Sequence, residues 1–172
     1  MPSHHRSKVE TRRTADRGLG LFATQGFAAD ELIVVTFCQV VPWTGQDEYN
    51  EQVHPFQIEI DVVAIPLGTE ISGMFAVNHS CSPNAGLRGQ LSLVALRPIA
   101  AGEEICFDYA MTDSDYFGKS IFQMSCLCGA PDCRKLVSDT DWRRTELRAK
   151  YRGYFSSYLT ARIQLEQGGT RA

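Results

Sequence analysis

Three cysteines stand close together near the end of the chain, in the stretch CLCGAPDC. They are Cys126, Cys128 and Cys133, and their CxCxxxxC spacing is more typical of metal ligands than of disulfides, because neighbouring thiols such as the first two do not bridge easily. A closed structural zinc site needs four ligands in a tetrahedron. If zinc is bound, a distant segment must supply the fourth ligand, which constrains the fold. The alternative is a set of reduced thiols without metal.

The loop NHSCSPN, residues 78–84, offers two candidates for that fourth ligand, His79 and Cys81. Cys81 is preferred, because a fourth thiolate completes an all-sulfur site and leaves His79 for other work. We therefore expect a structural zinc ion held by Cys81, Cys126, Cys128 and Cys133.

Composition and charge limit which partners and which cellular location we expect for the protein. The chain has 172 residues, of which 44% are hydrophobic and 22% charged, as expected for one folded domain with an appendage. A net charge of −3 argues against direct nucleic-acid binding. The longest apolar runs, such as LIVV, are too short to span a membrane, and the N-terminus has no apolar signal segment. We expect an intracellular protein that contacts neither nucleic acid nor membrane.

Short strands joined by turns are predicted for most of the chain. Clusters of β-branched residues predict a strand after Asp30, a strand pair that turns near Asp61, and two strands separated by Pro98 and Gly102. From about residue 139 onward, apolar and aromatic residues recur at helical spacing, with a break at Gly153. This aromatic stripe is expected to pack on the domain, the alternative being a peptide-binding lid or a dimer face. The fold class is mainly β with some α.

Four motifs occur in order along the chain: RGLGLFA, VNHSCSPNA, GEEICFDYA and CLCGAPDC. In order and spacing they resemble the SET-domain protein-lysine methyltransferases with a cysteine-rich post-SET segment, over roughly residues 8–135. The resemblance implies small curled β-sheets with a knot-like threading of the C-terminal stretch. It also implies S-adenosylmethionine (SAM) as methyl donor and a lysine-containing protein or peptide, histone, histone-like or non-histone, as acceptor.

The resemblance divides the chain into four parts. We expect a flexible arm over 1–7, the SET domain over 8–119, the zinc-binding post-SET segment over 120–137, and a C-terminal helical extension over 138–172. Such an enzyme would be cytoplasmic in a bacterium, and nuclear or cytoplasmic in a eukaryote.

The resemblance also implies roles for individual residues. Tyr109 corresponds to the tyrosine whose hydroxyl lies at the point of methyl transfer, and Phe107 to the position that affects how many methyl groups are added. A phenylalanine there leads us to expect products beyond monomethyllysine. The implied cofactor-binding residues are Arg17, Gly18, Leu19, Gly20, Asn78, His79, Tyr109 and Leu127.

Each of these residues also has a purely structural interpretation. Gly18 and Gly20 would only allow a turn, and Asn78 would form an Asx turn. Phe107 would be a core residue, and Tyr109 a half-buried residue of a strand.

The expected chemistry needs no dedicated base. Lysine at neutral pH is mostly ammonium, and burial beside a positively charged sulfonium would lower its pKa and expose the lone pair. Glu104 and Asp108 are accordingly interpreted as structural residues.

The sequence also departs from the family pattern. Many members carry Arg-Phe where this chain has Phe75 and Ala76, which affects part of the cofactor contact. Tyr49 and Tyr116 are the candidates for a second active-site tyrosine. Two rival functions stay open: a catalytically silent SET-like peptide-binding module, and a small zinc-binding interaction protein without a SAM site.

Overall fold

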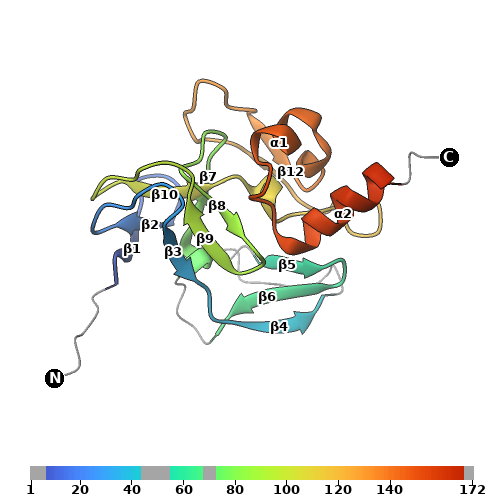
Figure 1. Cartoon of the computed structure of the whole chain (residues 1–172), viewed down its shortest axis with the longest axis horizontal. Helices are drawn as coiled ribbons and strands as arrows, with labels where there is room; N and C mark the ends of the chain where they lie inside the picture. The colour runs from blue at the N-terminus through green and yellow to red at the C-terminus, as the bar shows by residue number, and fades with distance from the viewer. Residues whose placement is uncertain (1–6, 44–54, 68–72, 169–172) are drawn as a thin grey trace.

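The computed structural model describes residues 7–43, 55–67 and 73–168. Within these ranges the chain forms small antiparallel and mixed sheets, with two short α-helices gathered at the C-terminal end (Figure 1). The mainly β class and the short strands are therefore confirmed. Tyr49 and most of the expected N-terminal arm lie outside the described residues.

A four-stranded sheet in the order β1-β2-β10-β7 carries the N-terminal motif beside the loop of Asn78. Its strands are β1 (Val9–Arg13), β2 (Leu19–Ala23), β10 (Glu104–Phe107) and β7 (Asn78–His79). Strand β10 runs antiparallel to β2 and parallel to β7, so that Cys106 lies opposite Asn78. Segments far apart in the sequence thus meet along β10.

Two three-stranded sheets complete the β-structure of the SET region. One has the order β3-β9-β8, and the other β4-β6-β5. Their strands are β3 (Leu32–Val35), β8 (Ala85–Arg88), β9 (Ser92–Ala95), β4 (Cys38–Pro42), β5 (Phe56–Glu59) and β6 (Val62–Pro66). Strands β5 and β6 form the hairpin predicted near Asp61, and β3 is the strand predicted after Asp30.

The cysteine-rich segment lies on a small hairpin of its own. Strands β11 (Gln123–Ser125) and β12 (Leu136–Ser138) pair antiparallel and enclose the three clustered cysteines between them. Strand β12 crosses the expected boundary at residue 137, because its hydrogen bonds to β11 continue to Ser138. The post-SET hairpin and the C-terminal extension are therefore continuous.

The C-terminal extension forms short helical pieces. A 3₁₀ turn η3 (Asp141–Arg143) precedes α1 (Thr145–Lys150), and α2 (Ser157–Gly168) follows. The break predicted at Gly153 is present, since this glycine has φ +85° between the two helices. Helix α1 begins later than residue 139, because Arg144 has an extended backbone (φ −67°, ψ 124°) that separates η3 from α1.

The aromatic stripe of the extension packs into the main core. Its buried members are Trp142, Leu147, Tyr151, Phe155 and Leu159, which join the cluster built around Leu21, Ile105 and Phe107. The packing interpretation of the stripe is thereby confirmed. Among the described residues, no helix is long and apolar enough to cross a membrane.

Replacing Leu159 by alanine should show that the extension belongs to the cooperative unit. Leu159 is fully buried on α2, whereas Leu165 on the same helix is 76% exposed. We expect Leu159→Ala to lower the free energy of unfolding by about 2–5 kcal/mol, since it leaves a cavity in the core. Leu165→Ala, the matched control, should change it by less than about 0.5 kcal/mol. Urea titration measures both, and equal small effects would contradict the integration of α2.

Candidate active site and metal centre

The four expected cysteines come together in space. The Sγ atoms of Cys81, Cys126, Cys128 and Cys133 all lie within 4.8 Å of one another, and those of Cys81 and Cys126 are 3.9 Å apart. Zinc–sulfur bonds of about 2.3 Å in a tetrahedron separate the sulfurs by about 3.8 Å. This donor set therefore fits a closed zinc site.

The thiols of this cluster have unequal acidities. Burial raises the pKa of Cys81 to about 11 and also raises that of Cys126. Burial opposes ionisation of Cys128 as well, but backbone donation from Cys81 and Ala130 lowers its pKa to about 6. All four thiols can be thiolates together only if a cation compensates their charge.

His79 lies next to this cluster and contacts it through its ring. Its Nδ1 accepts a hydrogen bond from the Tyr109 backbone N–H at 3.2 Å, so the proton of the neutral ring is on Nε2. Nε2 lies 3.3 Å from Cys81 Sγ and donates toward it. Burial lowers the pKa of His79 to about 4, and the ring is neutral at physiological pH. His79 thus connects Cys81 of the cluster to the backbone of Tyr109.

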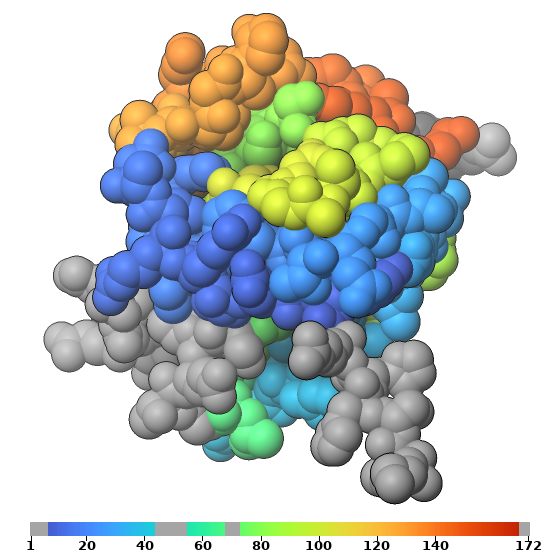
Figure 2. Space-filling view, turned by 90° about the vertical axis from the view of Figure 1, so that its left-hand side faces the viewer, coloured from blue at the N-terminus to red at the C-terminus, as the bar shows by residue number. Residues whose placement is uncertain are grey.

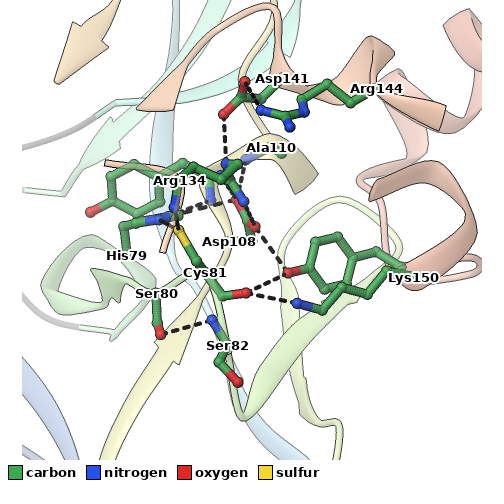
Figure 3. Close-up of polar contacts among 12 residues, drawn as sticks. His79, Ser80, Cys81, Ser82, Asp108, Ala110, Arg134, Asp141, Arg144 and Lys150 are labelled. Carbon is green, nitrogen blue, oxygen red and sulfur yellow. Dashed lines mark hydrogen bonds and ion pairs between the residues drawn. The ribbon is translucent and has the colours of Figure 1, made fainter. Parts of the chain in front are cut away.

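Asp108 is the centre of a buried network that includes Arg134 and lies beside Cys81 (Figure 3). Its carboxylate is fully buried and accepts two hydrogen bonds from the Arg134 guanidinium, at 2.6 and 2.7 Å. Arg134 also donates to Asp141 at 3.0 Å, and its backbone N–H points at Cys81 Sγ at 3.3 Å. Burial alone would lower the pKa of Arg134, but the hydrogen bonds that it donates to the Asp108 carboxylate raise its pKa above the ordinary value. The guanidinium of Arg134 therefore stays charged.

The same network reaches the expected catalytic tyrosine and the extension. Asp108 caps the 3₁₀ turn η2 (Tyr109–Met111) by accepting from the Ala110 N–H at 3.0 Å. Tyr151 donates to Asp108 at 2.9 Å and also contacts the Cys81 carbonyl, which accepts from Lys150 at 2.8 Å. Two residues of the extension thus hold the loop of Cys81 against the turn of Tyr109.

A cleft of about 220 Å³, here the Asn78 cleft, brings together most of the predicted cofactor residues. Its walls combine Arg17, which precedes β2, and the polar residues of β7 with side chains of the cysteine-rich hairpin, which lies above the N-terminal strands (Figure 2). The lining residues are Arg17, Asn78, His79, Tyr109, Met124, Ser125, Cys126, Leu127 and Cys128. Small-molecule sites usually measure about 300–1,000 Å³, so a molecule of the size of SAM would be only partly enclosed here.

Glu104 organises the polar side of the Asn78 cleft. Its carboxylate accepts from Arg17 at 2.6 Å and from Asn78 at 2.8 Å, and Asn78 also donates to the Leu19 carbonyl at 2.9 Å. A Cβ on Gly20 would lie 2.9 Å from Glu104 Oε1, so glycine is needed for this approach. Gly18 has φ +72° and makes a turn. The structural and the cofactor-binding interpretations of these glycines are compatible.

Tyr109 and Phe107 lie side by side at the end of β10. Their ring centroids are 5.1 Å apart, and Phe107 is fully buried between Tyr109 and Phe56. The Tyr109 hydroxyl donates to the Val77 carbonyl at 3.2 Å, and burial raises its pKa well above the ordinary value. Tyr109 therefore stays protonated at neutral pH.

A second pocket of about 150 Å³, here the Trp43 pocket, is lined by two neighbours of Tyr109, Phe122 and Asp113. Its walls come from the β5–β6 hairpin and from the segments that follow η2. They consist of Trp43, Pro55, Gln57, Val63, Asp113, Ser114, Ile121, Phe122 and Asp139. The Phe122 ring is 6.4 Å from that of Tyr109, and the Asp113 N–H donates to the Tyr109 carbonyl at 2.9 Å. Tyr116 is half-buried beside Trp43, with ring centroids 5.5 Å apart.

Sequence reasoning missed Arg134, and it assigned Glu104 and Asp108 only a general structural role. A weak signal exists for Arg134, since an arginine directly after a metal ligand, once buried, requires a carboxylate partner. Phe75 and Ala76, which replace the family's Arg-Phe, are both buried in or at the end of the turn η1 (Gly73–Ala76). They supply no cation to the Asn78 cleft, whose lining includes Arg17.

The sequence profile of the SET domain matches residues 18–110, more than half of the chain. The chain belongs to the SET-domain family. The match ends just after Tyr109 and includes both the glycine motif and the loop of Asn78, so the family resemblance is confirmed.

Curated relatives of this SET domain are histone-lysine N-methyltransferases. "Histone-lysine N-methyltransferase trr" of Drosophila melanogaster is 29% identical over 80% of this chain and 6% of its own length. The H3 lysine-36 specific enzyme of Candida albicans is 30% identical over 76% of this chain and 17% of its own length. The H3 lysine-4 specific enzyme of Saccharomyces cerevisiae is 29% identical over 73% of this chain and 13% of its own length. The chain thus spans a small part of each relative.

Solved structures share the fold. The crystal structure of KRYPTONITE in complex with mCHH DNA, H3(1-15) peptide and SAH has a TM-score of 0.57 and 23% identity, over 77% of this chain and 30% of that chain. A second KRYPTONITE complex, with mCHG DNA and SAH, has the same TM-score at 24% identity. The expected SET fold is thereby confirmed.

The Asp108–Arg134 pair should be a major source of stability. Asp108→Asn leaves the buried guanidinium of Arg134 with only Asp141, and we expect a loss of about 3–5 kcal/mol in the free energy of unfolding. Asp30→Asn is the matched control, since Asp30 forms an ion pair with Arg88 in which both side chains are more than half exposed. Denaturant titration should show almost no change in that control. Equal losses in the two variants would contradict the role of the buried network.

Proposed function

We propose that this SET domain is a SAM-dependent protein-lysine N-methyltransferase with a structural zinc ion. The observation that carries the proposal is the position of Tyr109 between two pockets. It lines the Asn78 cleft, and it neighbours the Trp43 pocket, because its ring lies 6.4 Å from that of Phe122 and its backbone carbonyl accepts from the Asp113 N–H. A transferase needs such a point, because donor and acceptor must meet in line.

On the donor side, the Asn78 cleft suits a nucleoside cofactor. Asn78 and Arg17 supply hydrogen-bond donors that Glu104 holds in place, and Met124 and Leu127 supply apolar surface for a base. The Leu127 side chain is 66% exposed and would be covered when the cofactor binds. SAM, when bound, supplies the electrophilic methyl group.

On the acceptor side, the Trp43 pocket suits a lysine side chain. Of the described residues that line it, two are carboxylates, Asp113 and Asp139, and none is basic, which favours entry of a cation. Apolar walls of Trp43, Val63 and Phe122 then favour the neutral amine, because desolvation lowers the pKa of lysine. No histidine or glutamate base is assigned.

Tyr109 acts as a dipole at the meeting point. Its hydroxyl stays protonated, donates to the Val77 carbonyl, and offers oxygen lone pairs to the reacting groups. Phe107 is fully buried, packs against this ring and offers no hydroxyl. This environment supports the expectation that methylation proceeds beyond the first methyl group.

The proposed zinc ion would do no chemistry but would fix the wall of the Asn78 cleft. Cys126 and Cys128 both line that cleft, and Cys81 is linked through His79 to the backbone of Tyr109. The thiolates of Cys81, Cys126, Cys128 and Cys133 would hold the ion.

The relatives support a histone tail as the substrate and the nucleus as the place of action. They are histone-lysine methyltransferases, and one structural neighbour is a complex with an H3(1-15) peptide. A non-histone lysine stays the alternative within this class. The rival function is a silent peptide-binding module, and methyl incorporation into core histones or a mixed cell extract separates the two.

Tyr109→Phe should remove methyl transfer and leave cofactor binding intact. Losing one preorganised hydroxyl at the point of transfer should lower the rate by about 10²-fold or more, while the ring keeps its packing. Radiolabel incorporation measures the rate, and calorimetry measures the Kd for SAM. Tyr154→Phe is the control, since the Tyr154 hydroxyl bonds to Asp30 away from both pockets. A Tyr109→Phe enzyme as active as the control would contradict the assigned role.

The purified protein should contain about one zinc ion per chain, the stoichiometry of a closed four-ligand site. Chelation should lower the thermal midpoint and loosen residues 120–137 in hydrogen exchange, because metal binding contributes folding free energy. Cys133→Ser should lose the metal, whereas Cys38→Ser, which lies outside the cluster, should retain it. A metal-free wild-type protein with full stability would exclude the zinc centre.

A further inference from the structure

The turn between η2 and β11 has an unusual backbone. Tyr116 and Lys119 exchange backbone hydrogen bonds of 2.9 and 2.8 Å across it, so Phe117 and Gly118 form its two central residues. Their φ angles are +47° and +82°. Positive φ at both central positions is the pattern of a type I′ turn, which prefers Asn or Gly at the first of them. Phe117 is therefore strained by its own side chain.

Burial does not compensate for this strain. The Phe117 side chain is 62% exposed, and its ring packs edge-on against the neighbouring Tyr116, at 4.8 Å between ring centroids. The turn is held by other groups, since Asp115 accepts from the Gly118 N–H at 2.9 Å. Of the non-glycine residues with positive φ in the described ranges, Asp30 and Lys135 are polar and Phe117 is the aromatic one. A bulky, strained and exposed residue points to a function outside the fold.

The position of Phe117 suggests which function this is. Its ring packs against the ring of Tyr116, which in turn packs against Trp43. Trp43 lines the proposed lysine pocket. Ile121, which also lines that pocket, is 41% exposed. Phe117, Tyr116, Trp43 and Ile121 thus form a partly exposed apolar strip, here the aromatic rim, that is continuous with the Trp43 pocket.

We propose that the aromatic rim binds a non-polar side chain of the substrate next to the target lysine, with Phe117 as the specificity-determining contact. The proposal rests on the function proposed above, because it places the lysine in the Trp43 pocket. The occupant is non-polar, since the exposed surface of Phe117 and Ile121 has no charged or hydrogen-bonding group, and burial of apolar area would stabilise the complex.

Synthetic peptides test the chemistry of the occupant. Each carries one central lysine, and one flanking position at a time is Leu, Phe, Ala or Arg. We expect the wild-type enzyme to prefer Leu or Phe at one flanking position by about fivefold in KM, a difference typical of one partly buried apolar contact. Phe117→Ala should abolish this preference. Equal KM values for all peptides, a preference for Arg, or a preference that survives Phe117→Ala would overturn the proposal.

Phe117→Asn separates recognition from folding. Asparagine tolerates positive φ, so the thermal midpoint should stay the same or rise, while KM for the preferred peptide increases about fivefold. The kcat and the Kd for SAM should not change. Phe37→Ala, which removes another exposed phenylalanine (85% exposed), should leave KM unaltered. A lower midpoint with unchanged KM would assign Phe117 to the fold and overturn the proposal.

Peptide binding measured by fluorescence anisotropy distinguishes a failure of the proposed methyltransferase function from a failure of the proposed aromatic rim. Binding that depends on Phe117, without methylation of any peptide or extract by the wild type, would refute the methyltransferase function and retain the rim. Methylation that is indifferent to Phe117 would refute the rim alone.

Discussion

The buried ion pair between Asp108 and Arg134 holds the separate parts of this SET domain together. Asp108 is fully buried at the end of β10, and a charge in such a place is tolerated only with a partner of opposite charge and complete hydrogen bonding. Arg134 supplies the opposite charge in a bidentate contact of 2.6 and 2.7 Å, and the Ala110 N–H and the Tyr151 hydroxyl complete the hydrogen bonding. Because Arg134 directly follows Cys133, this contact fixes the cysteine-rich hairpin against the turn of Tyr109.

The position of the expected catalytic tyrosine depends on two connections to the cysteine cluster. One runs from Cys81 through the neutral ring of His79 to the Tyr109 backbone, and the other runs from Arg134 through Asp108 to the cap of η2. The wall of the Asn78 cleft comes from the same hairpin. The geometry of the cleft and the geometry of Tyr109 are therefore set together.

The C-terminal extension supports both sides of the site. Near the cysteines, Tyr151 and Lys150 hold the Cys81 carbonyl. On the other side, Arg162 of α2 donates to Ser114 at 2.6 Å, and Ser114 donates to Gln57 at 2.8 Å, so that a helix outside the matched SET region braces the wall of the Trp43 pocket. The extension is thus part of the domain that forms the site.

Much of this could be predicted from the sequence, because the signals are local. Runs of β-branched residues mark the strands, the spacing of three cysteines marks a metal site, and NHSCSPN supplies Cys81, which the fold brings into their cluster. The order of four motifs identifies the family. Such features need only residue type and separation along the chain, so they can be predicted before the folded structure is known.

Other features were decided only by the tertiary structure. Nothing in the local pattern pairs Arg134 with Asp108, joins Glu104 to Asn78 and Arg17, or shows that Phe117 takes a positive φ and stays exposed. The side chains in each pair lie far apart in the sequence and meet only after the sheets have packed. Their charges are tolerated, and their conformations are selected, by neighbours that only the folded chain brings into contact.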